Sequence, residues 1–273
     1  MVLYSRWLAY SNFQVKMDLC FQRLALLLVK VVNTLLGDMN MNYYTNQRAK
    51  LMKGFEKAFR CAEEPILKHF NKDQTAEIHE HARAIFSDMI PKLPYIGGKK
   101  LPGTQNLIGS VQLLAIIKAL ESAGLSRSEI GETVYKTLEN TFERIPRFLG
   151  RIMGRIMMSS AFIKKRQALI AKTQKREYPE AFVTVYAPSK DGSYDFGQDV
   201  MECAVHKFYR AQDALEYLPY ICLGDYPMFR RMGVHFYRTQ TLGNGGDLCD
   251  FRFSRQGETM RGWPPESLPE WKG

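Results

Sequence analysis

The chain has 273 residues, of which 45% are hydrophobic and 24% are charged, a composition typical of a globular protein with a large core. Its net charge of +10 raises the question of nucleic-acid binding, but no DNA- or RNA-binding motif accompanies the positive charge, so we exclude that class. Five cysteines, an odd number without paired spacing, argue against a secreted disulfide framework and favour a reducing, cytoplasmic location.

Residues 1–40 form a leader that we expect to be dispensable. Residues 24–36 are apolar, but Arg23 and Lys30 interrupt them, and the stretch is shorter than the roughly 20 residues that a membrane-spanning helix needs. No small-residue cleavage site of a signal peptide follows it. The alternative is an amphipathic surface helix that touches lipid or a partner. We do not expect membrane contact through this leader.

The region 41–178 is expected to be helical, because its apolar residues recur every three or four positions. Pro65 ends or kinks the first helix, and Ser126 with Glu129 forms a capping-box pattern. The predicted helices cover residues 47–71, 76–90, a strongly amphipathic helix over 107–120 that Thr104 caps and Gly124 closes, and residues from 126 to just before Pro146.

Three arginines recur every four residues on the helix that follows, at Arg147, Arg151 and Arg155. This spacing places them on one helix face. We interpret the stripe as a solvated face, with anion binding as the alternative.

The pattern changes at residue 179, and residues 179–255 form an α+β region that carries the candidate site. Residues 182–186 and 194–197 have the composition of two strands joined by a turn. Residues 199–212 are predicted as a helix bearing Cys203, and Asp225 is placed to cap a short helix that ends at Gly233. A helical region followed by a small antiparallel sheet is an α+β fold. The tail, residues 256–273, is predicted to be extended.

A β-hairpin is the strongest local prediction. Residues 234–242 and 247–254 have strand composition, and Asn244-Gly245 between them is a preferred two-residue turn. This turn pairs Leu242 with Asp247 and Gln240 with Cys249. Since side chains alternate along a strand, one face of the hairpin carries Phe236, Arg238, Gln240, Cys249, Phe251 and Phe253. An arginine among phenylalanines must be satisfied either by a bound anion or by an ion pair with Asp225, Glu202 or Asp199.

Three sequence blocks in this region resemble one enzyme family. They are residues 194–203, residues 218–226, and the run from Arg238 to Phe251 with its sequence RTQTLGNGGDLCDF. An upstream segment, residues 94–99, fits the same pattern. The chain resembles the L-2-amino-thiazoline-4-carboxylic acid hydrolase family from about Met41 to Ser254, and nothing before Met41 fits. The resemblance implies hydrolysis of a non-peptide C–N bond in a cyclic amidine or thiazoline carboxylate.

The candidate catalytic residues are Cys249, Asp225 and Glu202. A nucleophilic Cys249 needs a nearby cation that favours its thiolate, and Arg238 on the same hairpin face is suitable. A carboxylate at a helix N-terminus is held ionised, which suits a general base or a water-positioning group. For Cys249 and Asp225 the structural alternatives are a core residue and a helix cap.

The candidate substrate-binding residues are Arg238, Gln240, Cys203, Cys222 and Asp250. The guanidinium of Arg238 offers a planar fork that suits a substrate carboxylate. Asp250 points away from Cys249 in the predicted register, so pairing with Thr239 or Arg252 is its structural alternative.

The expected partner is therefore a small-molecule substrate with a carboxylate, and no cofactor is expected. Zinc is the one metal that the three cysteines could bind, but their separations do not match a paired zinc-site pattern. The turn formed by Gly97, Gly98 and Lys99 is a second place where an anion could bind. The rival interpretation from another class is a non-catalytic small-molecule-binding or sensor domain that uses the same pocket. A third is a membrane-surface adaptor, which rests on the leader and the net charge.

Overall fold

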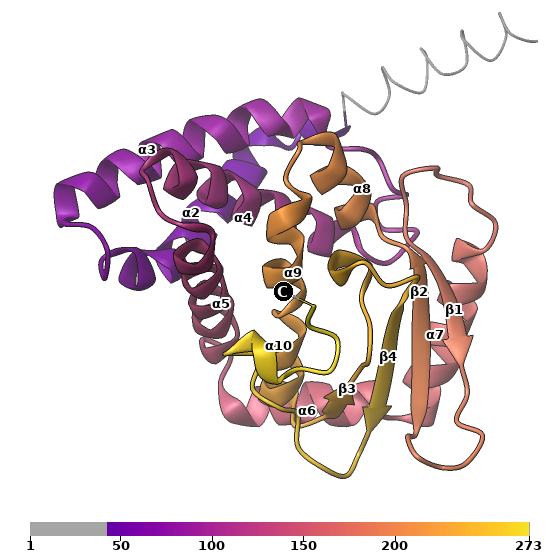
Figure 1. Cartoon of the computed structure of the whole chain (residues 1–273). Coiled ribbons are helices and arrows are strands. Elements are labelled where there is room, and N and C mark those ends of the chain that lie inside the picture. Colours follow the sequence, from indigo (N-terminus) through magenta and orange to yellow (C-terminus); the bar gives the residue numbers. More distant parts are fainter. Residues whose placement is uncertain (1–42, 273) are drawn as a thin grey trace, which may run out of the picture.

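The computed structural model describes residues 43–272 of the chain. The predictions for residues 1–40, and the predicted boundary at residue 41, lie outside the described residues. The described part is an α+β fold, as expected: helices come first, and a four-stranded antiparallel sheet follows in the C-terminal region (Figure 1).

The helical region confirms most of the periodicity predictions. Ser126 caps its helix through a capping box with Glu129, and Pro65 lies in the last turn of the first helix. Gly103 rather than Thr104 is the N-cap of the third, because the Thr104 hydroxyl donates to the Gly98 carbonyl instead. The helices are α2 (Arg48–Ile66), α3 (Lys72–Met89), α4 (Thr104–Ser122), α5 (Arg127–Glu143), α6 (Arg147–Met157) and α7 (Ser160–Thr173), with a short 3₁₀ turn η1 at Ile90–Lys92.

Helix α4 was predicted to be amphipathic, but the structure buries nearly all of it. From Leu107 to Leu120 only Gly109 and Lys118 are partly exposed. The reason is its position: α4 packs against α3 on one side, and against α2, α5 and α8 (Ala204–Ala211) on others. A helix that is apolar all round is a buried helix. Helix α4 therefore forms the centre of the core.

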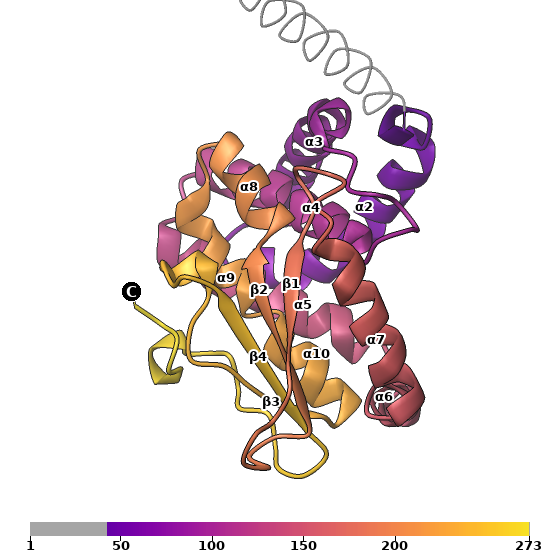
Figure 2. The same ribbon diagram turned by 90° about the vertical axis from the view of Figure 1, so that its right-hand side faces the viewer.

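The C-terminal region contains the sheet, whose strand order is β1-β2-β4-β3. Figure 2 shows β2 and β4 crossing in front of α5 and α10, with α7 beside β1. The strands are β1 (Val183–Ala187), β2 (Phe196–Glu202), β3 (His235–Tyr237) and β4 (Cys249–Ser254). The remaining elements are α9 (Leu218–Cys222), α10 (Asp225–Met232) and the 3₁₀ turns η2 (Leu215–Tyr217), η3 (Leu242–Asn244) and η4 (Pro265–Ser267).

One face of the sheet packs on α10 and joins the common core. Phe236 lies opposite Phe253 in the β3–β4 ladder, and both rings contact Phe229 of α10 at centroid distances of 4.8 and 4.9 Å. These residues belong to the same buried cluster as the helical core. Aromatic packing thus holds the sheet against the helices. The end of the sheet where β2 finishes and β4 begins lies beside the cavity described below.

The helix predicted over residues 199–212 is wrong in its first part. Residues 199–202 complete β2, and the helix starts at Ala204 with Cys203 as its N-cap. Strand β2 is a central strand, and its backbone groups pair with β1 on one side and β4 on the other. Two ladders of tertiary hydrogen bonds outweigh the local preference for a helix.

The predicted hairpin is right in register and wrong in its turn. His235 pairs with Ser254 and Tyr237 with Arg252, which is the register that Leu242 opposite Asp247 implies. However, β3 ends at Tyr237, and residues 238–248 form a wider loop in place of a two-residue turn. The Thr241 hydroxyl and carbonyl accept backbone N–H groups of Asn244 and Gly246, so a capped 3₁₀ turn replaces the tight turn.

Candidate functional site

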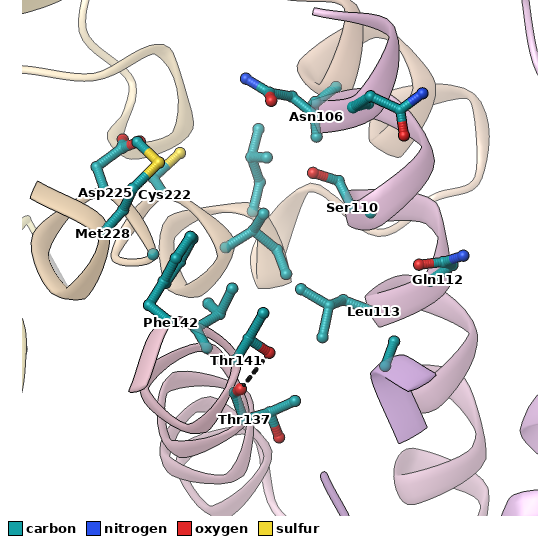
Figure 3. Close-up of a pocket in the computed structure, with 18 of the residues that line it drawn as sticks. Asn106, Ser110, Gln112, Leu113, Thr137, Thr141, Phe142, Cys222, Asp225 and Met228 are labelled. Carbon is teal, nitrogen blue, oxygen red and sulfur yellow. Dashed lines mark hydrogen bonds between the residues drawn. The ribbon is translucent and has the colours of Figure 1, made fainter. Parts of the chain in front are cut away.

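A cavity of about 770 Å³ opens where the helical region meets the sheet region. Figure 3 shows Ser110 and Leu113 of α4 pointing toward Thr141 and Phe142 of α5, with Cys222 and Asp225 on another side. The walls are mostly apolar. The hydroxyls of Thr137 and Thr141 donate to carbonyls of their own helix, so toward a ligand they can act only as hydrogen-bond acceptors in this arrangement. Its volume is in the range of pockets that hold drug-sized ligands.

The structure brings five of the eight predicted site residues to the cavity. They are Cys203, Cys222, Asp225, Arg238 and Cys249, all of which line its wall. Cys203 follows β2, Cys222 ends α9, Asp225 begins α10, and Cys249 begins β4. Cys203 and Cys249 are 46 positions apart in the sequence. They meet because the sheet and the junction between α9 and α10 line the same end of the cavity.

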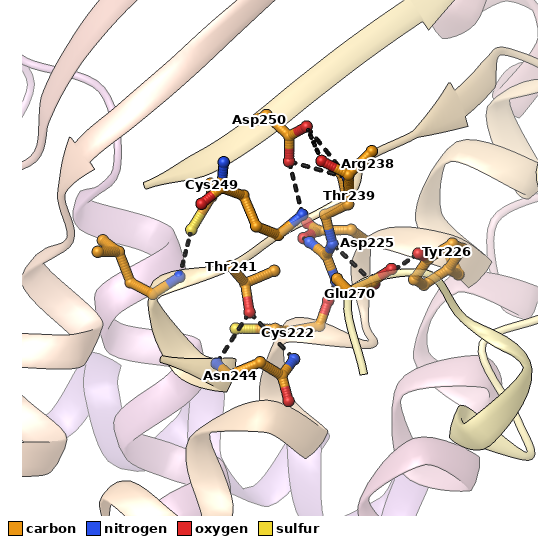
Figure 4. A network of polar contacts seen from close by, with 12 residues as sticks. Cys222, Asp225, Tyr226, Arg238, Thr239, Thr241, Asn244, Cys249, Asp250 and Glu270 are labelled. Atoms are coloured by element: carbon orange, nitrogen blue, oxygen red, sulfur yellow. Dashed lines mark hydrogen bonds and ion pairs between the residues drawn. The ribbon is translucent and has the colours of Figure 1, made fainter. Parts of the chain in front are cut away.

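Arg238 is buried at this end and is satisfied by the protein itself (Figure 4). Its Nη1 donates to Asp225 Oδ2 at 2.6 Å, its Nε to Glu270 Oε1 at 2.9 Å, and its Nη2 to the Cys222 carbonyl at 2.9 Å. The rings of Tyr226, Phe236 and Phe251 surround the guanidinium at 5.3–5.6 Å. Of the alternatives that the sequence left open for Arg238, the ion pair with Asp225 is present.

Asp225 was predicted to cap α10, but its side chain makes no capping bond and turns to Arg238. The Asp225 side chain is 26% exposed, and it lies at the cavity wall. Burial raises the pKa of Asp225, and Glu270 adds to this increase, although Arg238 opposes it by charge and hydrogen bonding. One cation shared between two carboxylates leaves an excess of negative charge, so Asp225 binds a proton more readily than an ordinary aspartate.

The three thiols at this end of the cavity, those of Cys203, Cys222 and Cys249, are poor sources of thiolate in the resting protein. Burial raises the pKa of Cys249 to about 12 and that of Cys203 to about 11. Burial also raises the pKa of Cys222 well above its usual value, even though the charge of Arg238 acts in the opposite direction. The prediction that Arg238 favours a Cys249 thiolate therefore meets a larger opposing effect, because removal from water penalises the charged sulfur.

Three predicted site residues lie away from the cavity wall. Glu202 forms ion pairs with Arg176 and with Lys207, the latter at 2.6 Å. Gln240 accepts a hydrogen bond from the Asp247 backbone at 3.2 Å. The Asp250 carboxylate accepts bonds from the Thr239 backbone and hydroxyl and from the Gln240 backbone. Asp250 thus pairs with Thr239, the structural alternative that the sequence suggested.

The loop between β3 and β4 holds the site in shape. The Asp250 carboxylate accepts hydrogen bonds from backbone N–H groups that would pair with β4 if β3 were longer. Leu242 donates its backbone N–H to the Cys249 sulfur at 3.3 Å. This arrangement fixes Cys249 beside the cavity. The turn with Gly97, Gly98 and Lys99 contributes no residue to the cavity wall.

Sequence reasoning missed Glu270, which the extended tail places in the core. Glu270 is fully buried, accepts a hydrogen bond from the Tyr226 hydroxyl at 2.5 Å and pairs with Arg238. Its Oε2 has no hydrogen-bond partner among the described residues. The only signal in the sequence was the buried arginine itself, because it required an acidic partner from elsewhere in the chain.

The sequence also gave no sign of Asn106 and Ser110, polar cavity residues on a helix whose neighbours are apolar. Among residues 43–272, no group of three or more His, Cys, Asp or Glu side chains is arranged to hold a metal ion. At the end of the cavity beside the sheet, the polar groups that converge are thus a carboxyl, three thiols and an arginine.

Comparison with known proteins places the chain in a family. The family model described as L-2-amino-thiazoline-4-carboxylic acid hydrolase matches residues 105–253, which is more than half of the chain. This range contains Cys203, Cys222, Asp225, Arg238 and Cys249, whereas Glu270 and the segment 94–99 lie outside it. No curated protein and no solved structure matches. The chain belongs to the L-2-amino-thiazoline-4-carboxylic acid hydrolase family.

Proposed function

We propose that the protein is a hydrolase that opens a C–N bond in a cyclic amidine or thiazoline carboxylate, with its reacting centre beside Asp225. Family membership supports this class of reaction. The observation that carries the proposal is the end of the cavity where Asp225, three thiols and Arg238 converge. A carboxyl with a raised pKa at a cavity wall is typical of a group that transfers protons near neutral pH.

In the proposed reaction, Asp225 is the general base and water is the only co-reactant. Its carboxylate takes a proton from water while the water oxygen bonds to the amidine carbon. That proton passes to an amidine nitrogen. As the C=O bond forms and the ring C–N bond breaks, the remaining proton of the added water goes to Asp225 and then to the departing ring nitrogen, so both protons of water end on nitrogen and the carboxylate is restored. Arg238 keeps the Asp225 carboxylate oriented through the 2.6 Å ion pair. Attack by Cys249 is the variant of this route, and it also needs Asp225, because the Cys249 thiol is neutral at rest.

The cavity supports a substrate larger than the bare ring. Its volume of about 770 Å³ suits a drug-sized ligand, and most of its wall is apolar. Three donors of Arg238 are already used by the protein, but Lys57, Arg60 and Arg144 also line the cavity, on the α2 and α5 side. We assign the substrate carboxylate to these cations and an apolar body to the walls between them and Asp225. Arg238 then acts on the substrate through Asp225.

The test is ring opening, followed by mass spectrometry, of thiazoline and cyclic amidine carboxylates with and without apolar substituents. Changing Asp225 to Asn should lower kcat/KM by about 10²–10⁴, the usual contribution of a general base. Glu202→Gln is the matched control, since Glu202 is a carboxylate of the same region that does not line the cavity, and it should keep full activity. Loss of activity in Glu202→Gln but not in Asp225→Asn would overturn the assignment.

A non-catalytic binding or sensor domain is the second candidate, and the protonated thiols and apolar walls favour it. If this candidate is right, members of the same panel bind, as measured by calorimetry, and return unchanged. We also propose a reducing, cytoplasmic location, supported by the free thiols of Cys61, Cys203, Cys222 and Cys249.

A further inference from the structure

Helix α6 turns an apolar stripe outward. Phe148 is 65% exposed and Ile156 is 56% exposed, which is unusual for side chains of this size. Among the described residues, six of the ten large apolar side chains that are exposed lie on α6 and α7: Phe148, Leu149, Ile152, Met153, Ile156 and Phe162. Figures 1 and 2 both place α6 at an outer edge of the molecule. The apolar stripe is therefore concentrated on one surface.

Two glycines explain why this side of α6 is the free one. Gly150 and Gly154 are buried against α10, and a Cβ there would lie 2.4 Å from the Arg231 carbonyl oxygen and 2.1 Å from that of Met232. The helix packs through its backbone on the glycine side. Its large apolar side chains are consequently left on the opposite side, where they do not contribute to the core.

Positive charge borders the stripe. Arg147, Arg151 and Arg155 are exposed, and their spacing of four residues places them along one side of the apolar residues. Within residues 43–272 none of the three forms an ion pair. From Arg144 to Arg176 the sequence has ten basic residues and no acidic residue. This segment alone carries as much net positive charge as the whole chain.

We propose that the α6–α7 surface, defined as residues 147–165, binds the surface of an anionic lipid bilayer. An apolar stripe with arginines along its border is the pattern of a helix that lies in the plane of a membrane. The stripe inserts between lipid headgroups while the arginines reach the phosphates. At 11 residues α6 is far too short to cross a bilayer, and no helix within residues 43–272 is long and apolar enough to do so.

Three partners could cover the α6–α7 surface: a lipid bilayer, a second copy of the chain, or residues 1–42. Their charges favour the bilayer. A second copy would bring the same arginines face to face. Residues 1–42 carry four basic and two acidic side chains, so they too have the same sign of charge. The described chain also begins at the end of the molecule away from α6, as both views show. An anionic bilayer offers apolar depth and negative charge together.

The experiment is flotation of the full-length protein with vesicles. Wild-type protein should float with vesicles of phosphatidylcholine and phosphatidylserine, float much less with pure phosphatidylcholine vesicles, and be released by high salt. Neutralising two arginines in Arg151→Gln/Arg155→Gln should lower the partition coefficient by about thirtyfold, since each basic residue near the surface contributes roughly a factor of five. Phe148→Ser/Ile152→Ser should also abolish flotation, through loss of the apolar stripe.

Matched control variants change the same chemistry elsewhere. Lys50→Gln/Lys53→Gln removes two exposed charges from α2, and Met201→Ser/Met260→Ser removes two exposed apolar side chains from the sheet and the tail. Both controls should float like the wild type. Circular dichroism and thermal melting establish that each variant is folded, and the two independent α6 variants keep the test decisive if one of them is not.

Three outcomes would overturn the proposal. The first is wild-type protein that does not float with anionic vesicles, whether or not it binds an acidic peptide. The second is flotation that both α6 variants retain, which would place lipid binding elsewhere, including residues 1–42. The third is a wild-type oligomer in sedimentation equilibrium that the α6 variants convert to a monomer without any effect on lipid, which would make this surface an interface between copies.

Discussion

Arginines are used in opposite ways in two regions of this molecule. Arg238 is buried beside the cavity, where Asp225 and Glu270 balance its charge and three aromatic rings surround it. On α6, arginines are exposed next to exposed apolar side chains and have no acidic partner within residues 43–272. A buried charge costs several kcal/mol unless it is paired, whereas an exposed one costs almost nothing. The difference indicates that Arg238 serves the molecule's own structure and that the α6 arginines are available to something outside it.

The strongest way to break this contrast is to remove the buried cation. Arg238→Met leaves Asp225 and Glu270 without their partner in the core, and we expect the free energy of unfolding to fall by about 3–5 kcal/mol. Chemical denaturation measures this change. Adding Glu270→Gln to Arg238→Met should restore part of the loss, because one stranded carboxylate is gone. A double variant no more stable than Arg238→Met would contradict this account.

The packing of α6 on α10 predicts the next largest effect. Gly154→Ala places a methyl group 2.1 Å from the Met232 carbonyl oxygen, so the helix must shift, at a cost of about 1–3 kcal/mol. Gly109→Ala on α4 is the control, since a Cβ there meets nothing within 4 Å. Thermal melting should show Gly154→Ala destabilised and Gly109→Ala unchanged or more stable. Equal melting temperatures for the two variants would refute the close approach of α6.

The raised pKa of Asp225 predicts a dependence of stability on pH. Its folded-state pKa lies above the unfolded value of 3.8, so its contribution to stability is fully present below that value and is lost as pH rises through the folded-state pKa. Asp225→Asn cannot ionise. We therefore expect its stability to fall less than that of the wild type as pH rises from 3.8 through the higher folded-state pKa of Asp225. Parallel denaturation curves for the two proteins at every pH would show that Asp225 is not perturbed.

The smallest expected effect concerns the exposed arginines of α6, in contrast to the buried Arg238. Arg151→Ala should change the free energy of unfolding by less than about 0.5 kcal/mol, because the side chain is exposed and makes no ion pair within the described residues. Denaturation with urea, carried out beside Arg238→Met, provides the comparison. A loss above about 1 kcal/mol would mean that this arginine has a structural partner.

How much could be predicted differs between the two regions. In the helical part, Ser126 with Glu129 opens α5, and Gly124 with its positive φ follows the end of α4, because caps and helix ends depend on residues close together in the chain. Residues 199–202 were mistaken for helix, since only the pairing of β2 with β1 and β4 makes them a strand. The hairpin register was correct because it follows from the alternation of apolar and polar residues along the two strands. Its turn was wrong because the side chains of Thr241 and Asp250 accept hydrogen bonds from backbone N–H groups of the loop.

The sequence by itself determined the α+β class and the family, because periodicity and local motifs depend on neighbouring residues, and it named eight candidate site residues, of which five meet at the cavity. Only the tertiary structure decided what these side chains do to one another. It brought Glu270 from the tail to Arg238, turned Asp225 from a helix cap into an ion-pair partner, and moved Glu202 away from the cavity. Burial, and with it the protonation of Asp225 and Cys249, is set by the atoms packed around each group, and those come from distant parts of the chain.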